Sequence, residues 1–177
     1  MSPAPKTPRR IPMTVTFLEM KQRPAPPGPP QPRGKIAILR AEKPTVHFYR
    51  YLYDTVGKDY FWVDRKKLSD AELAKILEAP TLELYVLYAE GAPAGFAELD
   101  FAEQDVAHLA YYGLMPEAIG RGLGPYFLYQ ACSICWSRPI KNLLVNTCTL
   151  DHPRALPMYQ RGGFVPYARE DRYIELP

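Results

Sequence analysis

Residues 116–124 read PEAIGRGLG, with glycines at three alternate positions. An apolar stretch typical of a β-strand precedes them, and residues with the spacing of an amphipathic helix follow. Glycine has no Cβ and lets a ligand approach the backbone, while a helix N-terminus presents unpaired N–H groups and a partial positive charge. The pattern therefore indicates either an anion-binding loop or a turn that is glycine-rich for packing alone.

Length and composition indicate one folded domain. The chain has 177 residues, of which 47% are hydrophobic, enough to bury one substantial core. No run approaches the roughly 20 apolar residues of a membrane span, and no apolar segment follows the basic N-terminal residues as in a secretory leader. We therefore expect a cytoplasmic protein that does not contact membranes. The CxxC pair Cys132 and Cys135 has no second pair to complete a zinc site, which favours buried free thiols and no bound metal.

The first 35 residues differ from the rest of the chain. They carry a net charge of +6 and ten of the 20 prolines, whereas the remaining residues carry a net charge of −3. A mildly acidic body is not expected to bind nucleic acid. We interpret residues 1–35 as a basic, proline-rich N-terminal extension and residues 36–177 as the folded domain. Within the extension, residues 24–34 should form an extended spacer rather than a binding motif, and residues 13–20 should dock on the body as an edge strand.

Hydrophobic periodicity predicts a mixed α/β or α+β fold. The first helix should run from Val46 until Gly57, and the capping-box sequence at 69–72 should open a second helix that stops before Pro80. A third helix should follow the glycines, and a short fourth helix should start near Asp151 or His152, lose one internal hydrogen bond at Pro157, and end at Gly162 or Gly163. Strands are expected at residues 36–40, 82–89, 94–100, 106–115, 143–148, 164–167 and 173–176.

Two motifs together resemble the GNAT superfamily of acetyl-CoA-dependent N-acetyltransferases. The first is the succession Leu114 to Gly124, and the second is Ala155-Leu156 followed by Tyr159 and Gly163-Phe164. The resemblance covers roughly residues 36–173. It implies a mixed, mostly antiparallel central sheet flanked by helices, and direct acetyl transfer from acetyl-CoA to a primary amine of a small molecule or amino group in a ternary complex. The alternative from a different class is a non-catalytic sensor or interaction module that binds coenzyme A.

The resemblance implies a set of residues that bind coenzyme A. The loop from Gly120 through Gly122 and Leu123 to Gly124 would hold the pyrophosphate through backbone N–H groups, with Arg121 as an added charge. On the preceding strand, the segment ending in Leu114 and Met115 would pair with the pantetheine arm, and the Leu114 amide would polarise the thioester carbonyl. His152 stands where many members place a cofactor-binding asparagine, and either binds the cofactor or caps the last helix. Ile119 departs from the Gln or Arg that usually opens the loop, which removes one side-chain contact.

The resemblance also implies catalytic and acceptor residues. Tyr159 would protonate the leaving thiolate, or else serve as a core aromatic residue. His108 and Glu98 are the candidates for the general base, with a water relay as the third alternative. The first two helices and their connection shape the acceptor site in this superfamily. Their aromatic and acidic residues would suit a cationic amine; they are Tyr49, Tyr53 and Trp62, accompanied by Asp59, Tyr60 and Asp64.

Overall fold

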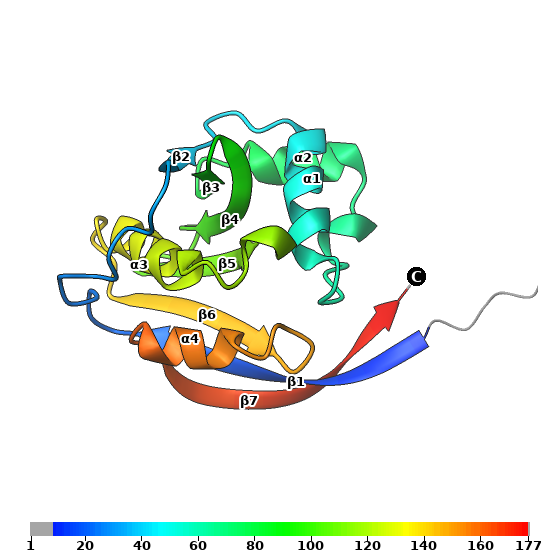
Figure 1. The fold of residues 1–177 in the computed structure, drawn as a ribbon. Helices are drawn as coiled ribbons and strands as arrows, with labels where there is room; N and C mark the ends of the chain where they lie inside the picture. The colour runs from blue at the N-terminus through cyan, green and yellow to red at the C-terminus, as the bar shows by residue number, and fades with distance from the viewer. Residues whose placement is uncertain (1–8, 177) are drawn as a thin grey trace, which may run out of the picture.

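The computed structural model describes residues 9–176. One seven-stranded sheet runs through the molecule in the order β2-β3-β4-β5-β6-β1-β7, with α3 and α4 drawn in front of it in Figure 1. All neighbouring strands are antiparallel except β5 and β6, which are parallel. This mixed α+β sheet confirms the predicted fold class. The strands are β1 (Arg9–Met20), β2 (Ile36–Arg40), β3 (Leu82–Ala89), β4 (Ala92–Asp100), β5 (Val106–Leu114), β6 (Asn142–Cys148) and β7 (Val165–Leu176), and the helices are α1 (Val46–Gly57), α2 (Asp70–Leu77), α3 (Leu123–Cys135) and α4 (Ala155–Arg161).

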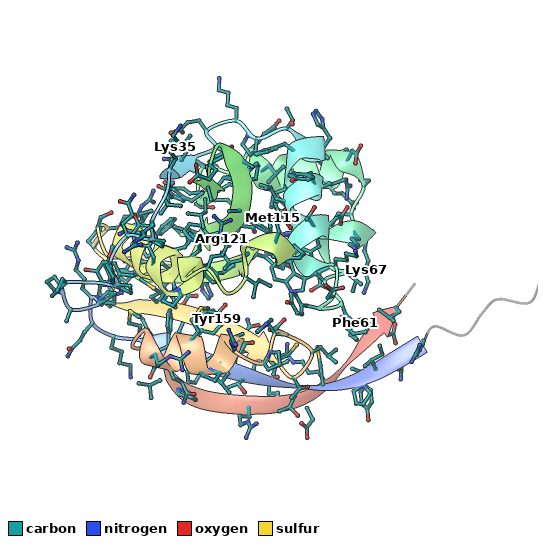
Figure 2. The ribbon with its side chains drawn as sticks, in the orientation of Figure 1. Lys35, Phe61, Lys67, Met115, Arg121 and Tyr159 are labelled. Atoms are coloured by element: carbon teal, nitrogen blue, oxygen red, sulfur yellow. The ribbon has the colours of Figure 1, made fainter. Side chains whose placement is uncertain are left out.

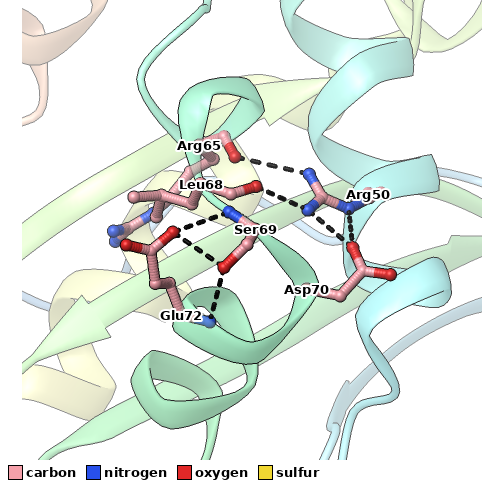
Figure 3. Close-up of polar contacts among 6 residues, drawn as sticks. All are labelled: Arg50, Arg65, Leu68, Ser69, Asp70 and Glu72. Atoms are coloured by element: carbon pink, nitrogen blue, oxygen red, sulfur yellow. Dashed lines mark hydrogen bonds and ion pairs between the residues drawn. The ribbon is translucent and has the colours of Figure 1, made fainter.

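Local sequence signals set the first two helices. Thr45 caps α1 by accepting a hydrogen bond from the Phe48 amide, and the apolar face of α1 is buried in the core. The predicted capping box opens α2: the Ser69 hydroxyl accepts from the Glu72 amide, and the Glu72 carboxylate accepts from the Ser69 amide (Figure 3). Both helices lie where the sequence predicted them.

Arg50 fastens the connection between α1 and α2. Its guanidinium donates to the Asp70 carboxylate at 3.0 and 2.8 Å, to the Leu68 carbonyl at 2.8 Å and to the Arg65 carbonyl at 3.4 Å (Figure 3). One side chain of α1 therefore binds backbone or side-chain oxygens on both sides of the residue that caps α2. Because these contacts span the end of the connection, they limit where the preceding residues 60–64 can lie.

The predicted edge position of residues 13–20 is wrong. β1 is longer than expected and lies inside the sheet, paired with β6 over residues 15–20 and with β7 over residues 9–19, rather than at an edge. Val15, Leu18 and Met20 are at most 4% exposed, so β1 contributes to the core. The proline clusters of residues 1–35 suggested a segment outside the sheet, but β1 itself contains only Pro12. Residues 21–35, which include the predicted spacer 24–34, then form a connection without helix or strand. At Gly28 this connection passes so close to the Tyr129 ring of α3 that a Cβ would clash.

The last helix also differs from its predicted start. α4 begins at Ala155 with Arg154 as its N-cap residue, because the Asp151 carboxylate accepts from the Cys148 amide and closes the turn after β6 instead. Pro157 is the third residue of α4, where the amide has no partner inside a helix, so it removes no internal bond. The helix ends at Gly162, followed by Gly163 with φ +106°, as predicted. The two expected final strands are one continuous strand, β7.

The parallel strands β5 and β6 separate along their length. They pair only where Val106–His108 faces Asn142–Leu144, although β5 continues to Leu114 and β6 to Cys148. Beyond His108, β5 keeps its pairing with β4 but has no partner on its other side. The sheet therefore opens at its centre, between residues that the sequence assigned to the cofactor and residues of β6.

Cys132 and Cys135 are buried free thiols, as predicted. Burial raises the pKa of both thiols, that of Cys135 to about 12, which keeps them protonated at neutral pH. None of the helices within residues 9–176 is long and apolar enough to cross a membrane.

Candidate active site

A cavity of about 990 Å³ occupies the opening between β5 and β6. It brings together most of the residues that the sequence selected, from β5, the glycine loop, α4 and the connection after α1. It also reaches residues of β1 and β7 that the sequence did not select. The predicted site residues that line it are Tyr53, Trp62, His108, Leu114, Gly120, Gly122, Gly124, His152 and Tyr159.

The glycines of the loop have two different structural roles. Gly120 and Gly122 have φ values of +83° and +76°, and a Cβ built on either would meet no protein atom within 4 Å. Gly122 is the N-cap residue of α3, so open space lies beside the helix N-terminus where unpaired N–H groups are found. Gly124 instead lies close to α4, since its Cβ would come 3.3 Å from the Met158 sulfur. Anion access and packing therefore both apply, at different glycines.

Two other loop residues point elsewhere. Arg121 is exposed and does not line the cavity, and Leu123 is a core residue with 1% exposure. Any contact of Leu123 with a cofactor would have to come from its backbone. The Tyr112 hydroxyl donates to the Gly124 carbonyl at 2.5 Å and fixes the start of α3 against β5.

The free side of β5 presents the Leu114 amide to the cavity. The Met115 amide donates to the Ala94 carbonyl of the β4 side at 2.8 Å, and the Gly113 carbonyl lies against Gly95 of β4. Since backbone groups alternate in direction along a strand, the N–H of Leu114 faces away from β4, towards the opening. Met115 itself is fully buried and does not line the cavity.

Tyr159 and His152 lie on the α4 side of the cavity. The Tyr159 ring packs edge-on against Phe164 and Tyr112, and Figure 2 shows Tyr159 on the α4 ribbon. Burial, with the nearby Asp151 charge, raises the pKa of Tyr159, so its hydroxyl keeps its proton at neutral pH. The His152 Nδ1 accepts a hydrogen bond from the Arg154 amide at 3.1 Å. The His152 ring packs edge-to-face with Tyr60, with the ring centres 6.1 Å apart. His152 therefore both lines the cavity and stabilises the turn before α4.

Glu98 and Tyr49 are not in the cavity. Glu98 has no exposed surface; Tyr49 donates to its carboxylate, and so does Arg65 at 2.5 Å. Burial raises the pKa of Glu98, and the Arg65 guanidinium opposes this. Arg65 also lies over the Tyr111 ring, with its Cζ 5.2 Å from the ring centre. The Glu98–Arg65 pair thus lies behind the cavity wall and supports Tyr111, which does line the cavity.

His108 lines the cavity at the end where β5 and β6 begin to separate. It is the last β5 residue paired with β6, and its Nε2 lies 3.0 Å from the Glu103 carboxylate. Leu114 is six residues further along, which corresponds to about 20 Å of extended strand. A proton could pass between these two positions only through water.

The acceptor side of the cavity agrees in part with the prediction. Tyr53, Tyr60, Trp62 and Asp64 line it, whereas Asp59 does not. The sequence analysis missed Tyr111 and the residues of β1 and β7. Tyr111 belongs to an aromatic pair before Gly113 in a predicted strand, which was a usable signal. In β1 the residues Met13, Val15 and Phe17 lie in the stretch predicted to dock as an edge strand, and that prediction gave the strand no part in the site.

A family model of the acetyltransferase (GNAT) family matches residues 43–164. The chain belongs to this family. Solved structures with the same fold include a GCN5-related N-acetyltransferase from Sphaerobacter thermophilus, with 15% identity, a TM-score of 0.64 and coverage of 96% of this chain and 52% of that one. An aminoglycoside acetyltransferase from an uncultured soil metagenomic sample has 14% identity and a TM-score of 0.60, with coverage of 72% and 86%. An IAA acetyltransferase from Bacillus cereus has 18% identity and a TM-score of 0.56, with coverage of 76% and 79%.

At these identities the structures show a common GNAT fold and leave the substrate open. The chain spans 62%, 52% and 52% of three of the matched structures, and so corresponds to little more than half of such proteins. No curated protein sequence is significantly similar to it. The open loop glycines, the free edge of β5 and the protonated Tyr159 of α4 all lie around one cavity.

Proposed function

We propose that this protein transfers the acetyl group of acetyl-CoA to the primary amine of a small molecule, by direct transfer in a ternary complex. The observation that carries the proposal is the open space beside Gly120 and Gly122, at the N-terminus of α3 and at the edge of a large cavity. A pyrophosphate fits such a site because backbone N–H groups and the helix dipole both favour an anion there. When bound, acetyl-CoA would supply the activated acetyl thioester.

The residues of the cavity have separate tasks in this proposal. The Leu114 amide donates a hydrogen bond to the acetyl carbonyl oxygen and stabilises the negative charge that develops there during attack. Tyr159 holds a proton that it can donate to the leaving sulfur, since its pKa stays high in its buried position. His152 contributes a cofactor contact from the α4 side.

Removal of the proton from the attacking ammonium is assigned to water. Glu98 is enclosed by Tyr49 and Arg65, and His108 is too far along β5 to reach the position of Leu114 directly. Water in the cavity can carry the proton towards His108, whose ring is accessible there. Neither of the two bases selected from the sequence, Glu98 and His108, lies beside Leu114, and this observation favours the second candidate, a protein that binds coenzyme A without turnover.

Calorimetric titration with acetyl-CoA tests the shared part of both candidates. We expect saturable binding at one site per chain, with competition by free coenzyme A. Binding followed by release of coenzyme A in the presence of an amine supports the transferase. Acetyl-CoA binding without release of coenzyme A in the presence of any amine supports the second candidate. Absence of acetyl-CoA binding contradicts both candidates.

A further inference from the structure

The N-terminal strand reaches into the candidate acceptor site, although it lies outside the part of the chain that the family model matches. We propose that β1 and β7 form the floor of the acceptor site and that this floor selects an amine carried on an apolar, aromatic body. The inference rests on the proposed function for its assignment of the acceptor side, and it makes a separate claim about binding.

The floor is continuous across three strands. Met13, Val15 and Phe17 are alternate residues of β1 and therefore share one face of the sheet, and all three line the cavity. Cys148 and Asn146 of β6 face Val15 and Phe17 in the register and line the cavity as well. On the other side, Ile174 and Arg172 of β7 continue the same face beside Ile11 and Met13.

The opposite wall comes from the connection after α1. Tyr60, Phe61, Trp62 and Asp64 line the same cavity as the floor, and Figure 2 shows Phe61 between the helices and the β1–β7 ribbon. Trp62 packs against Tyr111 and Tyr53 with ring centres 5.2 and 5.3 Å apart. The Arg50 contacts described above limit the position of this connection. The acceptor side is therefore a slot between an aromatic wall and a floor that is apolar at Met13, Val15, Phe17 and Ile174 and polar at Asn146 and Arg172.

Asp64 is the carboxylate of the aromatic wall, while Asp100, Asp151, Arg154 and Arg161 line other parts of the cavity. Asp64 precedes the turn Arg65–Lys67, and its carboxylate makes no capping hydrogen bond there. Burial raises the pKa of Tyr53; among the smaller causes the Asp64 charge raises it and the Arg65 charge lowers it, so both charges act on this part of the cavity wall. Arg172 does not offset the Asp64 charge fully, because its guanidinium is bound to Glu170 at 2.9 and 2.5 Å and lies 5.3 Å from the centre of the Phe17 ring.

The aromatic wall, Asp64 and the apolar residues of the floor disfavour amines that carry further polar groups. An ammonium group gains from Asp64 and from the aromatic faces around it. Hydroxyl or further ammonium groups would be placed against Met13, Phe17 and Ile174, where they would lose hydrogen bonds to water without replacement. A phenyl or branched alkyl body would bury apolar surface on the same floor. The structure therefore favours 2-phenylethylamine as a probe over ethanolamine or kanamycin.

The test measures amine binding directly, by calorimetry on the full chain saturated with coenzyme A. We expect 2-phenylethylamine to bind at least about tenfold more tightly than ethanolamine or kanamycin. Phe17→Ala and Met13→Ala should each weaken 2-phenylethylamine binding, by about tenfold for the ring and less for the thioether, and Asp64→Asn by about fivefold. Tyr173→Ala is the matched control on the same ribbon, because Tyr173 is 67% exposed and does not line the cavity.

The outcomes separate this inference from the proposed function. Unchanged amine binding in both Phe17→Ala and Met13→Ala, with thermal unfolding showing folded proteins, overturns the role of β1. Equal or tighter binding of ethanolamine or kanamycin overturns the selection for an apolar body. If 2-phenylethylamine binds as expected but no amine is acetylated, the inference stands and the transferase proposal fails.

Discussion

Tyr159 is the residue whose hydroxyl most clearly separates chemistry from packing. Tyr159→Phe keeps the ring contacts with Phe164 and Tyr112 and removes only the proton donor. We expect turnover to fall by about 10²- to 10⁴-fold, the range for one positioned proton donor. The acetyl-CoA dissociation constant and the melting temperature should change little. Wild-type turnover in Tyr159→Phe would make Tyr159 a core residue only.

Glu98 provides the opposite test at the same scale, because its carboxylate is buried and paired with Arg65. Glu98→Gln leaves the Arg65 guanidinium without its charged partner and should lower the free energy of unfolding by about 3 kcal/mol. Glu78→Gln at the exposed end of α2 is the control and should cost less than about 0.5 kcal/mol. Turnover of the folded Glu98→Gln protein should stay within about tenfold of wild type. A loss of more than about 100-fold would instead identify Glu98 as the base.

Single residues were also where sequence reasoning was least complete. Residue type and helical spacing placed Tyr49 with Tyr53 on one face of α1, but only Tyr53 reaches the cavity while Tyr49 turns to Glu98. The spacing identifies a buried face and cannot tell which members end at a core neighbour and which at an opening. The sequence could not decide between the general-base candidates for the same reason. The position of Glu98 on its strand does not show that Arg65, from another element, pairs with its carboxylate.

At the scale of elements, the glycine loop makes a prediction with an internal control. Gly122 and Gly91 both have positive φ, at +76° and +83°, and a Cβ on either would enter open space, but only Gly122 lines the cavity. Gly122→Ala and Gly91→Ala should therefore share a strain of about 1 kcal/mol. Only Gly122→Ala should raise the acetyl-CoA dissociation constant, by about tenfold or more. Equal effects of the two variants on binding would contradict the anion-binding role of the loop.

The N-terminal strand makes the second prediction at this scale. Leu18 is fully buried between neighbouring strands, so Leu18→Ala should lower the free energy of unfolding by about 3 kcal/mol. Leu39→Ala on β2 removes the same atoms from a site with 57% exposure and should cost less than about 0.5 kcal/mol. Chemical denaturation of both variants measures the difference. Equal, small losses in the free energy of unfolding would show that β1 does not stabilise the fold.

Elements were predictable where the signal was local. The capping box at Ser69, the hairpin between β3 and β4 and the helix after the glycines all depend on neighbours in sequence. The interior position of β1 depends on β6 and β7, more than 100 residues away, and no local pattern reports it. The start of α4 was misplaced because Asp151, a good capping residue, bonds back to Cys148 instead.

For the whole molecule, the family and the mixed sheet were accessible because two separated motifs occur in the right order on one chain. The interior position of residues 9–20 in the sheet was not, because the charge and proline content of residues 1–35 describe the composition of that segment and not its partners. The structure joins β1 to the sheet next to the cleft, so the cleft contains residues from both ends of the described chain.

The most direct test of the account is detection of the acetylated product. The full chain is incubated with acetyl-CoA and a panel of primary amines, and mass spectrometry measures the N-acetylated amine and free coenzyme A. We predict that at least one amine is acetylated, with one coenzyme A released per product. Saturable acetyl-CoA binding without N-acetylated product from any amine in the panel would contradict the account.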